Sequence, residues 1–86
     1  MPTVYLVPAG TDSAEGAAPG DYLLRPSGSD LYEIGKQDTA CTWIGTVAAS
    51  LLPDLPSVEQ PQEAPEQTAL LTALAGVEAA EHLRGG

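Results

Sequence analysis

The chain holds one histidine, His82, and one cysteine, Cys41, and these two residues have the widest chemical range in it. A histidine base or a cysteine nucleophile works in a shielded pocket, beside a partner that adjusts its proton affinity. His82 instead stands near the end of the chain beside Glu78 and Glu81, and Cys41 is distant in sequence. A metal site would require several His, Cys or clustered acidic ligands at fixed spacing. We therefore expect no catalytic residue and no metal site.

The glycines near the N-terminus are candidates for a loop that holds a phosphate group. Gly10, Gly16 and Gly20 alternate with acidic residues, which repel phosphate, and no lysine follows them. Any two of the twelve carboxylates could form an acid–base pair, but 86 residues leave little room for both a core and a substrate cleft. The sequence thus predicts a protein that is not an enzyme and holds no cofactor.

The last four residues, Leu83, Arg84, Gly85 and Gly86, carry a second kind of chemistry. This ending resembles the tail of ubiquitin-like modifiers and of sulfur-carrier proteins. The resemblance implies a β-grasp fold and a terminal glycine carboxylate that is adenylated and then carried as a thioester or thiocarboxylate. A simpler alternative is that Gly85 only ends a helix, as glycine often does. Conjugation at Gly85 and Gly86 therefore stays a second hypothesis.

Charge sets the class of partner that we expect. Twelve acids face three bases, Arg25, Lys36 and Arg84, which gives a net charge of −9. This charge repels nucleic acids and anionic membranes, so we expect another protein as the partner, and a basic surface on it would suit. A single cysteine allows no internal disulfide, and residues 1–3 begin no signal peptide. Both features favour the cytoplasm, or a virion if a phage encodes the chain, and the Ala, Gly and Pro usage is typical of high-GC bacterial or phage proteins.

Short β-branched or aromatic stretches predict three strands in the first half of the chain. Residues 3–7 form the first, before Pro8, and residues 21–25 and 31–34 form an antiparallel hairpin around a glycine-containing turn. Alternation along the last of these strands places Tyr32 and Ile34 on the inward face.

Residues 39–50 fit both a helix and a strand. Helical spacing joins Ala40, Ile44, Val47, Ala48 and Leu51. Thr42, Trp43 and Thr46 are strand formers, and Gly45 is a poor helix residue. We predict a strand over residues 42–47 and a short helical turn near residues 50–52, with a helix over the whole stretch as the open alternative.

The second half of the chain divides at a proline-rich segment. Residues 53–65 hold four prolines and three acids, which predicts an extended acidic linker. Residues 66–84 predict a helix on which Leu70, Leu74 and Val77 line one stripe, with Leu71 at its margin. The predicted organisation is a small β-rich domain over residues 1–52, the linker, and this helix, packed on the sheet or on a partner.

These elements predict an α+β fold with a small antiparallel sheet of three or four strands. The leading functional hypothesis is a non-catalytic protein that binds another protein, in an accessory, adaptor or regulatory role. Its candidate anchors are Leu70, Leu71, Leu74 and Val77, because an amphipathic helix docks through such a stripe. The alternatives are a modifier activated at its terminal glycines and a small phage or assembly structural protein that is stable only when packed on its neighbours, with a homo-oligomer as one form of such packing.

Overall fold

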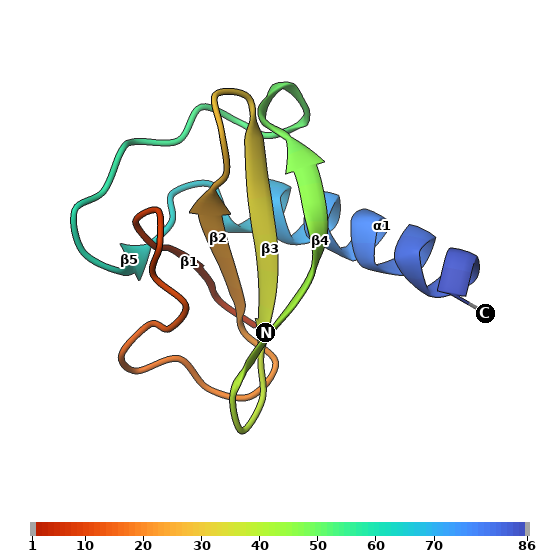
Figure 1. The fold of residues 1–86 in the computed structure, drawn as a ribbon, viewed down its shortest axis with the longest axis horizontal. Helices are drawn as coiled ribbons and strands as arrows, with labels where there is room; N and C mark the ends of the chain where they lie inside the picture. Colours follow the sequence, from red (N-terminus) through yellow and green to blue (C-terminus); the bar gives the residue numbers. More distant parts are fainter. Residues whose placement is uncertain (1, 86) are drawn as a thin grey trace.

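A computed structural model describes residues 2–85, with side chains described up to residue 80. Five strands precede one long helix (Figure 1). The elements are β1 (Val4–Leu6), β2 (Tyr22–Pro26), β3 (Leu31–Gln37), β4 (Cys41–Ala48), a 3₁₀ turn (Ala49–Leu51), β5 (Gln62–Glu63) and α1 (Gln67–Gly85). The predicted α+β class is confirmed, and so are the hairpin formed by β2 and β3 and the strand assignment of residues 42–47.

The strands form one mixed sheet in the order β4-β3-β2-β1-β5. The prediction of an antiparallel sheet of three or four strands is wrong in two respects, because there are five strands and β1 runs parallel to β2. The parallel pair is possible because residues 8–20 carry the chain back to the end of the sheet at which β1 begins, and β2 starts there (Figure 1). A parallel pair requires a connection of this length, whereas an antiparallel pair does not.

The proline-rich segment supplies the fifth strand. Its residues Gln62 and Glu63 pair antiparallel with Leu6 and Tyr5 of β1. Proline lacks a ladder donor and is tolerated at the margin of an edge strand, which is where this short pairing lies. Residues 53–65 therefore return along the sheet and bring the chain to the start of α1, instead of only spanning a gap.

Strand β4 contains a bulge that explains its mixed sequence signals. Ile34 pairs with Gly45 and Gly35 pairs with Trp43, so Ile44 is the extra residue. Because of it, Ile44 and Val47 both pack against the core on the helix side, three positions apart. A bulge thus reproduces in a strand the spacing that is typical of a helix.

Helix α1 packs across one face of the sheet and contacts both β1 and β4. The core between them is fully buried, and its largest members include Leu24, Ile34, Leu70 and Leu74. A smaller cluster of Val7, Ala14 and Leu23 lies on the opposite face. The long connection between β1 and β2 supplies Ala14, so this loop acts as the cover of the second face.

The start of α1 is fixed to β1 by one side chain. The amide of Gln67 accepts a hydrogen bond from the N–H of Val4 at 2.8 Å and donates to the carbonyls of Val4 at 2.8 Å and Ala64 at 2.7 Å. The Gln67 side chain therefore satisfies both backbone groups of the fully buried Val4, as a neighbouring strand would do. Glu66, whose carbonyl accepts the first helical bond at 3.0 Å, has a φ of 57°, a strained value for a residue with a side chain.

Candidate functional site

The four predicted anchors on the helix lie against the chain's own sheet. Leu70 and Leu74 are 0% exposed, while Leu71 and Val77 are half-buried against the same core. A partner could reach Leu70 and Leu74 only if α1 left the sheet. A candidate surface for binding must therefore be sought among residues that the fold leaves open.

The C-terminal features lie at or beyond the limit of the description. The side chain of His82, the surroundings of Gly85 and the whole of Gly86 are outside the described residues, so the hypothesis of conjugation stays a prediction. The element order does differ from the β-grasp arrangement that the tail resemblance implies. Helix α1 follows all five strands and runs to Gly85, with no later strand within residues 2–85.

Arg25 is mostly buried on the face of the sheet away from α1. Its guanidinium lies 3.7 Å from the centre of the Trp43 ring and bonds to both carboxylate oxygens of Glu33, at 2.9 and 3.2 Å. A third nitrogen donates to the carbonyl of Thr11 at 3.1 Å. Bidentate hydrogen bonds to a carboxylate and stacking on an aromatic ring are the two geometries that suit a guanidinium group best, and Arg25 has both. The charge of Arg25 is thus used within the fold.

Lys36 is paired on the helix face. Its ammonium donates to Glu78 of α1 at 2.9 Å, and the hydroxyl of Tyr22 donates to the other carboxylate oxygen at 2.7 Å. The hydrogen bond with Glu78 raises the pKa of Lys36, and burial together with the same carboxylate raises the pKa of Tyr22. Glu78 therefore joins the helix to β2 and β3.

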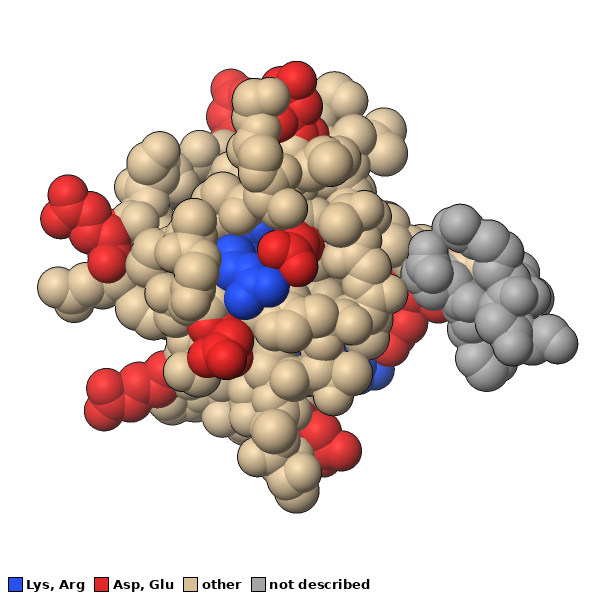
Figure 2. Space-filling view, viewed as in Figure 1, with Lys and Arg blue, Asp and Glu red and all other residues tan. Residues whose placement is uncertain are grey.

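Arg25 and Lys36 therefore each form an ion pair with an acid of the same chain. Most of the other described acids are exposed to solvent. Figure 2 shows acidic side chains at separate points around the outline of the molecule, and basic atoms at the centre of the view and at its lower right margin, each beside acidic atoms. Within residues 2–80, the three titratable groups with shifted pKa values do not converge, because Cys41 lies apart from Tyr22 and Lys36 on the other face. Burial raises the pKa of the Cys41 thiol, which makes it a weaker nucleophile at neutral pH.

The open side of β4 is the largest backbone surface left without a strand partner in the described part of the chain. β4 is the outer strand of the sheet and has eight residues, none of them charged and none of them proline. Long edges of this kind are templates for pairing, and proteins usually shorten, charge or cover them.

The hydrogen-bond register identifies which residues of β4 face outward. In β2, Tyr22 donates to Thr3 at 2.9 Å and Leu24 accepts from Val7 at 3.0 Å, so both residues bond to the β1 side. Since neighbouring residues of a strand bond in opposite directions, Arg25 bonds to the β3 side.

The same alternation continues to the edge. Arg25 pairs with Glu33, so the backbone of Glu33 faces β2 and cannot bond to its opposite residue on β4, Thr46. The carbonyl of Leu31 likewise accepts from the β2–β3 turn at 2.8 Å, and Leu31 is opposite Ala48. The N–H and carbonyl groups of Thr46 and Ala48 therefore point away from the sheet, toward an empty strand position.

A groove lies beside the first half of this edge. It is open, has a volume of about 440 Å³, and is lined by Gly20, Lys36, Gln37, Asp38, Thr42 and Ile44. Ile44 and the methyl group of Thr42, both from β4, give the groove an apolar wall. Asp38 adds a carboxylate, and Lys36 adds an ammonium group that is paired with Glu78. The sequence showed that β4 is uncharged, but the strand order that makes it an edge had no signal in the sequence.

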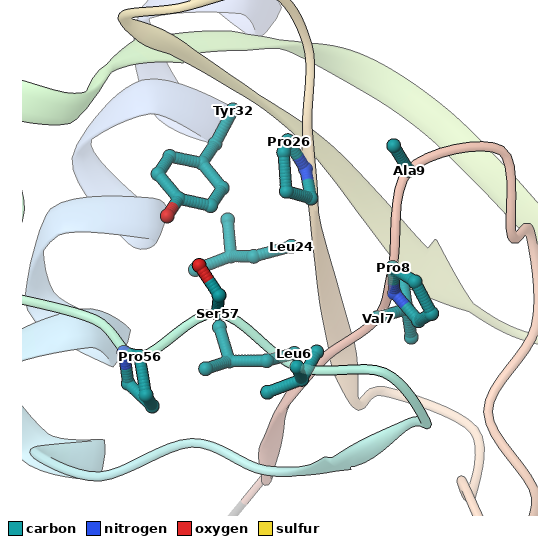
Figure 3. Close-up of a pocket in the computed structure, with 10 residues that line it drawn as sticks. Leu6, Val7, Pro8, Ala9, Leu24, Pro26, Tyr32, Pro56 and Ser57 are labelled. Carbon is teal, nitrogen blue, oxygen red and sulfur yellow. The ribbon is translucent and has the colours of Figure 1, made fainter.

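A second pocket lies at the far end of β1 and β2. It has a volume of about 200 Å³ and is lined mostly by apolar residues. Figure 3 shows the Tyr32 ring and the side chains of Leu6 and Leu24 turned toward the segment that carries Pro56 and Ser57. The proline-rich segment thus forms one wall of this pocket.

Among the residues that the structure describes, no three His, Cys, Asp or Glu side chains lie close enough to hold a metal ion. No helix within residues 2–85 has the length and apolar character needed to cross a membrane. Comparison of the chain with models of protein families, with curated proteins and with solved structures gave no match.

Proposed function

We propose that this protein is a small acidic binding module that acts on a basic protein partner and performs no catalysis of its own. The observation that supports it most is the use of Arg25 and Lys36 in internal pairs, within a chain of net charge −9. Within the described part of the chain, the exposed charges that a partner would meet are consequently mostly acidic. A field of one sign attracts oppositely charged partners, raises their association rate and keeps copies of the protein apart.

The open edge of β4 gives this module a place to bind. It combines unpaired backbone groups at Thr46 and Ala48 with an apolar groove beside Ile44. Nucleic acids and anionic lipids are disfavoured as partners by the same charge. A cytoplasmic setting, or a virion for a phage protein, is part of the proposal, since one half-buried cysteine suits a reducing compartment.

Selection from a peptide library tests this function and requires no identified partner. The full chain is immobilised and offered random peptides of about twelve residues, long enough to cover a strand such as β4. We expect the bound peptides to be enriched in Lys and Arg, and their affinity to fall at least about tenfold between about 0.05 and about 0.5 M NaCl because salt screens the attraction. Selection of peptides with no excess of basic residues, or an affinity that salt does not change, would reject the proposal.

A further inference from the structure

We propose that the basic partner supplies an extended segment that pairs with β4 and becomes the sixth strand of the sheet. This inference rests on the proposed function and adds the mode of binding. The outward N–H and carbonyl groups of Thr46 and Ala48 form the ladder for the new strand. Main-chain hydrogen bonds of this kind provide affinity, and side-chain pockets beside the edge provide specificity.

The two edges of the sheet differ in how well they are closed. β5 is only two residues long and lies between Pro61 and Pro65, which have no backbone donors. β4 has eight residues and neither proline nor charge. Prolines, charges and short length are the devices that prevent pairing at an edge, so the fold blocks one edge and leaves the other available.

The helix layer extends beyond the last strand. Figure 1 shows α1 passing behind β4 and continuing past it, away from the rest of the sheet. A strand added to β4 would have α1 beneath one of its faces instead of water. Val77, half-buried against the core, and Ile44 in the groove both lie on the helix side of the sheet, toward which the new strand would direct alternate side chains. One large apolar side chain fits a groove of about 440 Å³.

Charge selects a basic segment over a second copy of this chain. Two copies that pair through β4 would bring together molecules of net charge −9 each. Asp38 at the rim of the groove lies next to the start of β4 and is exposed. A Lys or Arg at one end of the bound segment would pair with this carboxylate, which places that end beside the start of β4.

A proline at Thr46 tests the pairing directly. Thr46→Pro removes an outward N–H while leaving the bonds between β4 and β3, because proline is tolerated where an edge N–H faces solvent. Thr46→Ala is the matched control, since it removes the exposed side chain but keeps the N–H. The probes are the basic peptides selected on the wild-type full chain. We expect Thr46→Pro to weaken their binding at least about tenfold and Thr46→Ala to change it less than about twofold.

Amide exchange in the unmodified chain gives a second measurement, which does not depend on the variant folding. Adding the peptide should slow exchange at Thr46 and Ala48 at least about tenfold, and much less at Val47, whose backbone faces β3. Unchanged peptide affinity in a folded Thr46→Pro protein, or no protection of Thr46 and Ala48, rejects strand addition. If basic peptides still bind with salt-dependent affinity in that case, the proposed function stands and only the mode fails. A dimer in sedimentation that Thr46→Pro dissociates would also reject it, because a second copy would then occupy the edge.

Discussion

Substituting Gly35 by alanine tests the packing that supports the Arg25 pair and the start of β4. A methyl group on Gly35 would stand 2.5 Å from the sulfur of Cys41 and 3.0 Å from two ring carbons of Trp43. The first distance is too short for a carbon–sulfur contact, so the Cys41 side chain must move, and the second requires the Trp43 ring to shift by a few tenths of an ångström. Trp43 cannot turn away freely, because Arg25 lies 3.7 Å from its ring centre and is itself held by Glu33.

The sign of the effect makes this substitution informative. Alanine in place of glycine inside a strand ordinarily stabilises a protein by roughly 0.5–1 kcal/mol, because glycine loses more freedom on folding. Overpacking of a filled site costs about 1–3 kcal/mol. We therefore expect Gly35→Ala to lower the free energy of unfolding by a net amount on the order of 1–2 kcal/mol.

Urea unfolding followed by the fluorescence of Trp43, the only tryptophan, measures this free energy. Cys41→Ala removes the nearest atom, so the double variant should recover part of the loss, with a coupling of at least about 0.5 kcal/mol relative to the sum of the single effects. A Gly35→Ala protein as stable as the wild type would refute the predicted clash. Strict additivity of the two substitutions would show that Cys41 is not the obstacle.

The attachment of α1 leads to three further predictions. Gln67→Ala leaves the buried N–H of Val4 without its partner, so it should lower the free energy of unfolding by about 1–3 kcal/mol, whereas a small effect, below about 0.5 kcal/mol in urea unfolding, would contradict the role of that side chain. Leu74→Ala removes a fully buried side chain and should cost about 2–5 kcal/mol, a large part of the stability of so small a domain; a loss below about 1 kcal/mol would mean that α1 is not packed on the sheet. The raised pKa of Tyr22 means that its contribution to stability is complete below its ordinary pKa of 10.0 and is lost as the pH rises through the folded value. Glu78→Gln should lower that pKa toward 10.0, which absorbance titration of tyrosinate can detect, and an unchanged titration would exclude Glu78 as a cause.

Local signals in the sequence predicted most elements, because each depends on neighbouring residues. The hairpin of β2 and β3 is encoded by two strand-forming runs around a glycine turn, and α1 by a stripe of leucines. The ambiguity of residues 39–50 has a physical source. The bulge at Ile44 shifts the alternation by one position, so Ile44 and Val47 share a face as they would in a helix.

Pairing over long distances could not be read in the same way. The parallel contact of Val4 with Tyr22 and the pairing of Tyr5 with Glu63 join segments whose sequences carry no mark of one another. The two-residue β5 is also too short, and too rich in neighbouring prolines, to produce a strand pattern. The edge position of β4 depends on these pairings. The sequence therefore contains every residue of the candidate site but does not predict that the site is at an edge.

The predicted helix anchors show that the sequence also does not identify which surface covers an apolar stripe. The stripe of Leu70 and Leu74 indicates that α1 must bury one face, but a stripe is the same whether a sheet of the same chain or a partner covers it. Here the chain's own sheet covers it, with Glu78 completing the contact by pairing with Lys36 and Tyr22. The leucine stripe that suggested a binding site is therefore part of the core and stabilises the fold.

An uncharged edge strand in a strongly acidic protein presents a conflict that its proposed function resolves. An open edge of eight residues would favour pairing between identical chains, and β4 carries none of the charges or prolines that prevent it. A net charge of −9 opposes such self-pairing by long-range repulsion without altering the edge itself. The same charge attracts a basic strand, so repulsion between copies and attraction to the partner come from one property. Neutralising exposed acids remote from β4 should then increase self-association while leaving the edge intact, and self-association that stays unchanged would separate the charge from the protection of β4.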